Sequence, residues 1–303
     1  MPNQGRNRSG KSGRLRLSAF VRSVRNNMSC PLCGSSAQTV FSIQHAPIVD
    51  CSACSHRFYK GTHCDNTVTQ IFDDSYFTGG GAGYSDYTSE KEMLIERGRM
   101  YAKKLEGLTH PGRILDVGAA CGFLLKGFVD SGWNGVGLEP NRAMTEMARS
   151  EVGMTVLPGT LEKAQFDERF DLISMIQVVG HLYDPAKAFT RAYELLNDDG
   201  LLLIETWDRS SISARIFGKR WHEYSPPSVV QWFSAKSLSE FLSHIGFERL
   251  TGGRPAKWIS GGHAASLLRY KLGNKRIFDL IPADLMMPYP AEDLFWAVYR
   301  KRN

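Results

Sequence analysis

The stretch RILDVGAACGFLL, residues 113–125, decides the fold of this 303-residue chain. The stretch begins with an apolar run that contains the acid Asp116. A glycine loop follows, and then an apolar segment typical of a helix. Comparable apolar runs follow at 136–138, 154–157, 172–179 and 201–204, and a last run, 293–299, can add an edge strand. Helical stretches separate these runs, and strands that alternate with helices predict an α/β fold in which both faces of a parallel sheet are covered.

The glycine loop predicts a ligand site. In an open parallel sheet ligands bind at the carboxyl ends of the strands, where Gly118 and Gly122 would let the backbone come close. Their G-x-x-x-G spacing is not the G-x-G-x-x-G of dinucleotide sites, and Asp116 would repel a diphosphate. Glu139 ends the next strand, where a carboxylate can accept two hydrogen bonds from ribose hydroxyls. A nucleoside with a positive charge fits both acids, which predicts S-adenosylmethionine as the cofactor.

Four of the six cysteines form a second signal. Cys30 and Cys33 make one C-x2-C pair, Cys51 and Cys54 make another, and seventeen residues separate the pairs, which is typical of a zinc ribbon. Four sulfur ligands leave no open position for water, so we expect a structural zinc ion. Nearby histidines such as His56 could replace a ligand, and four unmetallated thiols are the alternative.

The basic character of the chain belongs to its first 28 residues. The whole sequence carries a net charge of +6, and residues 1–28 contain seven arginines and lysines and no acid. The rest is close to neutral and offers no extended positive field to a nucleic acid. Composition predicts a disordered tail, with a targeting peptide or a translation start at Met28 as alternatives. No run approaches the roughly 18 apolar residues of a membrane span, so we expect a soluble cytoplasmic protein.

These signals divide the chain into four parts. We expect a tail at 1–28, a zinc ribbon at 29–60, an aromatic, glycine-rich lid and a helix at 61–110, and the parallel-sheet domain at 111–303, with a substrate-side insertion near 208–233. The helix has one face formed by Met93, Leu94, Arg97, Met100, Tyr101 and Leu105.

At these residues the sequence resembles the class I, Rossmann-like S-adenosylmethionine-dependent methyltransferases, in the branch with an N-terminal zinc ribbon. LDVGAACG matches the first motif, GLEP the ribose-binding acid, PGTLE the adenine-contacting turn and FDLISMIQVVGHLYDP the fourth strand and its loop. The resemblance implies a mostly parallel seven-stranded sheet with helices on both faces. It implies a cofactor site formed by Asp116, Gly118, Ala120, Gly122, Glu139, Thr160, Leu161, Gln177 and, on a closing loop, Tyr84.

Three positions depart from the family pattern. Ala120 replaces the usual central glycine, Gly180 replaces a glutamate often found before the histidine, and Val229 replaces a histidine that often follows paired prolines. The last two changes remove polar groups near the substrate. His181 is therefore either a general base or a loop histidine bonded to the backbone. His222, in the stretch RWHEYSPP, is the other catalytic candidate or a structural residue of a surface loop.

The expected reaction is methyl transfer from S-adenosylmethionine to an oxygen, nitrogen or carbon nucleophile. Alignment of donor and acceptor can by itself contribute about 7–11 kcal/mol. The resemblance points to a small-molecule acceptor such as a sugar, a polyketide or an envelope precursor. The alternatives are an RNA base methyltransferase that uses the ribbon and the basic tail, and a non-catalytic cofactor-binding ribbon protein.

Overall fold

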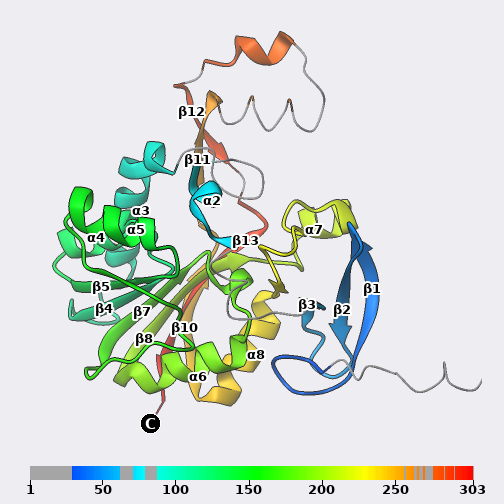
Figure 1. The fold of residues 1–303 in the computed structure, drawn as a ribbon, viewed down its shortest axis with the longest axis horizontal. Coiled ribbons are helices and arrows are strands. Elements are labelled where there is room, and N and C mark those ends of the chain that lie inside the picture. The colour runs from blue at the N-terminus through cyan, green and yellow to red at the C-terminus, as the bar shows by residue number, and fades with distance from the viewer. Residues whose placement is uncertain are drawn as a thin grey trace, which may run out of the picture.

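The computed structural model describes residues 29–61, 71–78, 87–255, 257–262, 265, 269, 276–282, 284–289 and 291–302. The predicted tail and Tyr84 lie outside these residues. A large sheet forms the centre of the molecule, with helices around it and a smaller sheet to one side (Figure 1). The large sheet consists of β4 (Arg113–Val117), β5 (Asn134–Glu139), β6 (Val156–Pro158), β7 (Phe170–Ile176), β8 (Leu196–Trp207), β10 (Phe247–Gly253) and β13 (Leu294–Lys301).

The order of the large sheet is β10-β13-β8-β7-β4-β5-β6. β4 pairs in parallel with β5 and β7, whereas β13 runs antiparallel between β8 and β10. The predicted mostly parallel, seven-stranded α/β sheet is confirmed. The expectation that 293–299 is an edge strand is wrong, because β13 has neighbours on both sides and is buried along nearly all of its length. The edge is β10.

Alternate residues of each strand pack on opposite faces of the large sheet. Ile114 belongs to a core cluster with α3 and α4, and the next residue, Leu115, belongs to the cluster with α6 and α8. Because both sides of the strands are covered, they are continuous apolar runs in the sequence. The helices are α2 (Asp74–Thr78), α3 (Lys91–Lys104), α4 (Phe123–Asp130), α5 (Arg142–Met147), α6 (Pro185–Leu195), α7 (Ile212–Phe217) and α8 (Ala235–Ile245).

Helix α3 crosses α4 at close range. Gly98 of α3 faces Gly127 of α4, and a Cβ atom on either glycine would overlap backbone atoms of the other helix. This contact shifts the buried face of α3 from the predicted one: Tyr101 is buried as expected, but Met93 is 47% exposed and Ile95 is buried instead. Small residues at a helix crossing decide which face is buried, and hydrophobic periodicity does not detect them.

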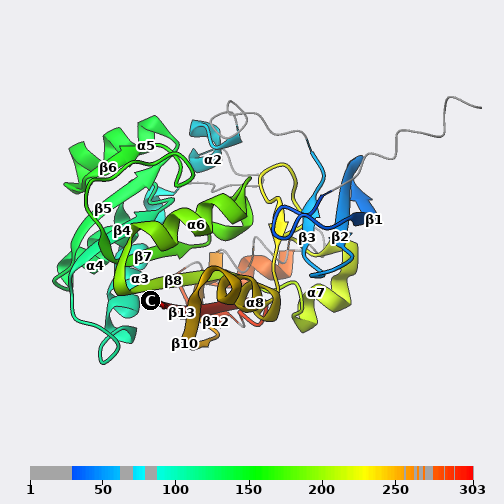
Figure 2. The ribbon, with the colours of Figure 1, turned by 90° about the horizontal axis from the view of Figure 1, so that it is seen from below.

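The N-terminal cysteine segment forms a second sheet that the large domain completes. β1 (Ala37–Ile43), β2 (Ala46–Cys51) and β3 (Arg57–Tyr59) are antiparallel, and β9 (Gln231–Trp232) pairs with β3. Both views show this ribbon sheet at the opposite end of the molecule from α4 and α5 (Figures 1 and 2). Backbone pairing across more than 170 residues of sequence therefore attaches it to the large domain.

Two excursions leave the large sheet. One contains α7 and the short helix η4 (Gly218–Arg220), and the other, between β10 and β13, contains β11 (Lys257–Ser260) paired with β12 (Met286–Tyr289). The sequence indicates only the first. No helix in the described part of the chain is long and apolar enough to cross a membrane. The remaining short helices are η1 (Thr88–Glu90), η2 (Ala148–Val152), η3 (Val179–His181) and η5 (Arg276–Leu280).

The glycine contact between α3 and α4 gives a stability prediction. Gly98→Ala adds a methyl group where the backbone of α4 lies, so we expect a loss of about 1–3 kcal/mol in the free energy of unfolding despite the higher helix propensity of alanine. Lys103→Ala, an exposed change in the same helix, should change it by less than about 0.5 kcal/mol. Denaturant titration of both variants makes the comparison, and equal stabilities would mean that the helices do not touch at Gly98.

Candidate active site

A cavity of about 160 Å³ opens at the carboxyl ends of β4, β5, β6 and β7. The loops after these strands form one wall, and α3 and an aromatic segment that precedes it form the other. Gly122 does not line the cavity; it lies behind the loop as the left-handed N-cap of α4. The predicted residues that line it are Asp116, Gly118, Ala120, Glu139, Thr160, Leu161, Gln177 and His181.

The loop after β4 is held in a left-handed conformation. Gly118 has φ 69°, its N–H donates to the Leu138 carbonyl at 2.7 Å, and a Cβ atom at this position would lie 2.5 Å from Val178. Ala120 also has a positive φ, 47°, where an L-residue pays roughly 1–2 kcal/mol. The usual glycine of this motif therefore has a conformational reason, and Ala120 adopts the same geometry at a cost.

Glu139 ties two loops together. Its Oε2 accepts a hydrogen bond from the Ala120 N–H at 3.0 Å, and its Oε1 accepts one from the Asn141 N–H at 2.9 Å. The side chain is almost fully buried, and burial raises its pKa to about 7 although both amides favour the carboxylate. Each oxygen keeps a second lone pair, so the carboxylate can still accept hydroxyl donors from a ligand.

Asp116 lies beside Glu139 at the end of β4. Its Oδ1 accepts a hydrogen bond from the Ser174 hydroxyl at 2.6 Å, and the residue is 3% exposed. Burial raises the pKa of Asp116 to about 7, against the Ser174 hydrogen bond, and the charge of Glu139 adds to the rise. Arg97, the one arginine or lysine among the described lining residues, is paired with Glu205, so the two buried acids favour a ligand that carries positive charge.

A second buried acid network lies under the cavity, and sequence reasoning missed it. Glu205 on β8 is fully buried and accepts hydrogen bonds from Arg97 and Tyr101 of α3. The Gln177 amide donates to the same carboxylate at 3.1 Å, and its backbone N–H donates to the Glu205 carbonyl at 2.7 Å. The network holds Gln177 at a positive φ of 60° and places Arg97 in the cavity wall. An acid inside the apolar run LLLIETW was the available signal.

His181 lines the cavity with a defined tautomer. Its Nδ1 lies 2.7 Å from the Ser228 carbonyl oxygen. A carbonyl can only accept, so Nδ1 carries the proton and the neutral ring keeps its lone pair on Nε2. Burial lowers the pKa of His181, against this hydrogen bond, and the rings of Phe72 and Tyr76 approach it edge-on at 5.3 and 6.5 Å.

The aromatic segment before α3 covers the cavity. Phe72, Tyr76, Phe77 and Tyr87 all line it, and successive rings meet edge-to-face at 5.0 to 5.6 Å. The Asn141 amide donates to the Phe72 carbonyl at 2.9 Å, so this wall is anchored beside Glu139. Tyr84 lies outside the described residues.

His222 is not part of the cavity lining. Its ring packs edge-on against Trp207 and Trp221, and its Nε2 lies 3.3 Å from the Glu223 carboxylate. The side chain is 41% exposed. The two predicted catalytic histidines therefore occupy different places, and only His181 adjoins the two acids in one cavity.

The ribbon sheet contacts the loop that carries His181. The buried His56 hydrogen-bonds through Nε2 to the Gln231 side-chain oxygen at 2.8 Å, and the Gln231 amide donates to the Leu182 carbonyl at 3.0 Å. Val230, next to Gln231, donates its N–H to the Gly180 carbonyl at 2.8 Å. His56 thus connects the ribbon to η3 and is not part of the cysteine cluster.

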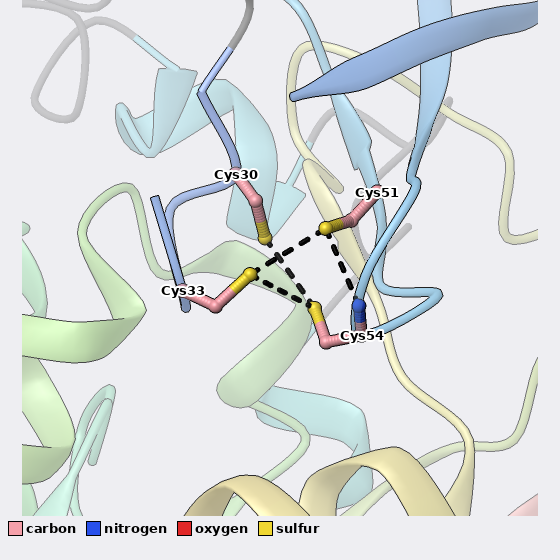
Figure 3. A group of neighbouring side chains, drawn as sticks. All are labelled: Cys30, Cys33, Cys51 and Cys54. Atoms are coloured by element: carbon pink, nitrogen blue, oxygen red, sulfur yellow. Dashed lines mark hydrogen bonds between the residues drawn. The ribbon is translucent and has the colours of Figure 1, made fainter. Parts of the chain in front are cut away.

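Cys30, Cys33, Cys51 and Cys54 converge on one point (Figure 3). Their Sγ atoms all lie within 4.8 Å of one another, with three pairs at 3.5 to 3.6 Å. A Zn–S bond of about 2.3 Å requires S–S separations of about 3.8 Å in a tetrahedron, so the four sulfurs fit a zinc ion. Backbone N–H groups of Leu32 and Ala53 point at two of the sulfurs at 3.4 Å, as thiolate ligands require.

The comparison with known proteins agrees with this geometry. Residues 93–251, more than half of the chain, match the family described as "Methyltransferase domain". The chain belongs to this methyltransferase family. It has the Rossmann-like sheet of the class I, S-adenosylmethionine-dependent methyltransferases, and the cavity opens at the carboxyl ends of β4 and β5, the edge at which open parallel sheets bind ligands.

Relatives of this methyltransferase share its sheet domain. It is 32% identical over 153 residues to the ubiquinone biosynthesis O-methyltransferase of Azorhizobium caulinodans and 30% over 164 residues to that of a Bradyrhizobium species. The matches cover 48% and 52% of this chain and 59% and 63% of those proteins. The chain thus spans less than two thirds of the length of these relatives.

Solved structures show the fold alone. A putative methyltransferase from Bacillus halodurans matches with a TM-score of 0.51 at 15% identity, and the match covers 68% of this chain and 99% of the Bacillus protein. A putative methyltransferase in complex with the Trm112 activator from Haloferax volcanii has a TM-score of 0.53 at 14% identity, with coverage of 71% and 95%.

The two buried acids predict a pH-dependent cofactor affinity. With pKa values near 7, Asp116 and Glu139 are mostly protonated at pH 6, whereas a sulfonium, an ammonium and ribose hydroxyls favour the carboxylates. S-adenosylmethionine should therefore bind more tightly at pH 8 than at pH 6, by about tenfold for each carboxylate that must ionise. In calorimetric titrations, Asp116→Asn should remove the contribution of Asp116 to this pH dependence and leave that of Glu139. A wild-type affinity that is constant from pH 6 to pH 8 would contradict this prediction.

The same pKa values predict how the unliganded protein responds to pH. Unfolded carboxyls titrate near pH 4, so between about pH 4 and pH 7 the folded state holds more protons than the unfolded state. These two groups should therefore lower the free energy of unfolding as pH rises through this window. Denaturant titrations of wild type and Asp116→Asn at pH 5 and pH 7 give the change in the free energy of unfolding with pH for each protein. The difference between these two changes is the contribution of Asp116.

The cysteine cluster predicts one zinc ion per chain. Metal binding to such sites contributes roughly 10–16 kcal/mol to folding, so chelation should expose β1, β2 and β3 and, through the pairing with β3, also β9. Hydrogen exchange should accelerate in these strands while β4, β5 and β7 stay protected. Cys51→Ser should abolish zinc binding, and Cys121→Ala, a buried cysteine outside the cluster, should retain it. Absence of zinc after purification without chelators would contradict the assignment.

Proposed function

We propose that this methyltransferase methylates a hydroxyl oxygen of a small molecule and that His181 is its general base. S-adenosylmethionine supplies the electrophilic methyl group when bound. The observation that carries the proposal is the hydrogen bond of His181 Nδ1 to the Ser228 carbonyl, which leaves the Nε2 lone pair as the only basic atom of the ring. A hydroxyl is a weak nucleophile until its proton is removed, so an oxygen acceptor needs such a base.

The electrostatics of the site support this role for His181. Burial lowers its pKa, so the ring is neutral and able to accept a proton at pH 7. The His181 ring would gain a positive charge when it takes the acceptor proton, and Asp116 and Glu139 line the same cavity as counter-charges. The hydrogen bond to Ser228 fixes the ring orientation without a carboxylate neighbour, which agrees with Gly180 in place of the usual glutamate.

We assign the cofactor to the acids and loops at the ends of β4 to β7. Glu139 would accept the ribose hydroxyls and Asp116 would attract the positively charged end of the cofactor. The turn after β6 would contact the adenine, and Gln177 would lie near the reacting centre. The full proposed set is Asp116, Gly118, Ala120, Glu139, Thr160, Leu161, Gln177 and Tyr84, with Arg97 as an added cation for a ligand carboxylate. Gly122, the N-cap of α4, would shape the loop without touching the cofactor.

A small acceptor fits the shape of the site better than an RNA base. The rings of Phe72 and Tyr76 line the cavity beside His181 and offer an apolar contact to a flat or aliphatic acceptor. The sequence relatives are named for O-methylation in ubiquinone biosynthesis, which favours oxygen over nitrogen or carbon.

We further propose that the ribbon is a structural zinc module that orders the base-bearing loop. It holds β9 through β3. Val230, just before β9, and Gln231, in β9, donate to the Gly180 and Leu182 carbonyls on either side of His181. A four-sulfur site has no open position for a substrate, so the metal takes no part in chemistry.

Substitution of the two histidines tests the assignment of the base. His181→Ala should lower kcat by roughly 10²–10⁴ with little change in the affinity for S-adenosylmethionine. His222→Ala, the matched histidine outside the cavity, should stay within about threefold of wild type. In wild type at saturating cofactor, kcat should fall only below pH 6.5 because the pKa of His181 is lowered. A larger loss of kcat in His222→Ala than in His181→Ala would overturn the assignment.

The acceptor can be found with labelled cofactor. We expect cell extract incubated with the protein and methyl-labelled S-adenosylmethionine to yield a labelled small molecule that mass spectrometry identifies as a methyl ether. Treatment with ribonuclease should leave the label in the same product. Label that becomes small only after ribonuclease treatment would indicate RNA, and label on nitrogen or carbon would contradict the hydroxyl acceptor.

A further inference from the structure

A second cavity lies between the ribbon sheet and the excursion that contains α7. Its volume is about 490 Å³, and both views place α7 beside the ribbon strands (Figures 1 and 2). The ribbon contributes Phe41 and Arg57, and the large domain contributes Arg209, Arg215 and Lys219. The cavity therefore exists only where the ribbon meets the methyltransferase domain, and four cations from two distant segments, β3 and residues 209–219, line it.

The positive charge of this cavity is only partly balanced. Arg57 is paired with Asp50 through two hydrogen bonds of 2.7 Å, and it donates a third, also of 2.7 Å, to the Tyr224 hydroxyl. Arg209, Arg215 and Lys219 form no ion pair within the described part of the chain, and no acid lines the cavity. Asp208 and Asp50 attract the Arg209 guanidinium from nearby without forming an ion pair with it, and the Oδ1 of Asp208 accepts two hydrogen bonds from Ser210.

Arg209 has an unused donor. One terminal nitrogen of its guanidinium donates to the Ser55 carbonyl, which fixes the side chain against the ribbon. Its Nε is buried and has no hydrogen-bond partner. A buried donor without a partner is destabilising, so the Arg209 Nε–H would gain from an acceptor oxygen that the described part of the chain does not supply.

We propose that this cavity binds the phosphate or diphosphate group of a small molecule. Planar guanidinium groups match phosphate oxygens in pairs, and a lysine adds a point charge. Three unpaired cations call for a ligand with two or more negative charges, which a phosphate monoester carries near pH 7. The Tyr224 hydroxyl accepts from Arg57 and keeps its own hydrogen to donate. The site is separate from the cavity of the proposed reaction, and its assignment does not depend on which acceptor is methylated.

Calorimetric titration of the full-length protein with inorganic pyrophosphate tests the site. We expect saturable binding with one site per chain at low ionic strength. Arg215→Glu combined with Lys219→Glu reverses two exposed charges of the cavity and should weaken binding at least tenfold. The matched control is Lys187→Glu with Lys236→Glu, which reverses two exposed charges on α6 and α8 and should leave the affinity within twofold of wild type. Thermal unfolding of each variant should show that both retain the fold.

Three results would overturn the inference. The first is the absence of saturable pyrophosphate binding by wild type, and the second is an equal loss of affinity in the cavity variant and the control. The third concerns nucleic acid: a single-stranded RNA oligonucleotide that binds through the same two residues and is not displaced by pyrophosphate would assign the cavity to a nucleic-acid backbone. Displacement of the oligonucleotide by pyrophosphate supports the small-phosphate site.

Discussion

The geometry of the candidate active site depends on two hydrogen bonds that the Glu139 carboxylate accepts. It accepts the N–H of Ala120 from the loop after β4 and the N–H of Asn141 from the loop after β5, so one side chain holds two loops at a fixed separation. Asn141 in turn holds the aromatic wall through the Phe72 carbonyl. Burial makes this carboxylate costly in the unliganded protein, and a ligand with hydroxyl donors and positive charge would offset the cost.

The position of the His181 loop, at another part of the cavity wall, depends on the contact between the ribbon sheet and the large domain. β9 has only two residues, yet it completes the ribbon sheet, and the chain around it binds the carbonyls of Gly180 and Leu182. The ribbon therefore acts on the loop of His181 without entering the cavity. The same contact creates the basic cavity on its outer side, where ribbon and methyltransferase domain share the lining.

Much of the site was predictable from local patterns. The apolar runs locate the strands because both faces of a parallel sheet are buried, and the acids Asp116 and Glu139 follow from their places at strand ends. Two C-x2-C pairs predict four converging thiols because a short turn brings each pair to one point. The Glu205 network was not predicted, since its partners come from α3, far away in sequence, and pairing across that distance has no local signature.

By itself, the sequence determined the strand-helix alternation, the cofactor loop, the cysteine quartet and the family, because each is encoded in residues that are neighbours along the chain. Only the tertiary structure decided that Gly98 turns α3 onto α4, that β13 is inserted between β8 and β10, and that His181 rather than His222 adjoins the acids. It also decided that Arg57 and Arg209 line one cavity. These features depend on close approach between distant segments, which backbone geometry and packing fix and which periodicity along the chain does not record.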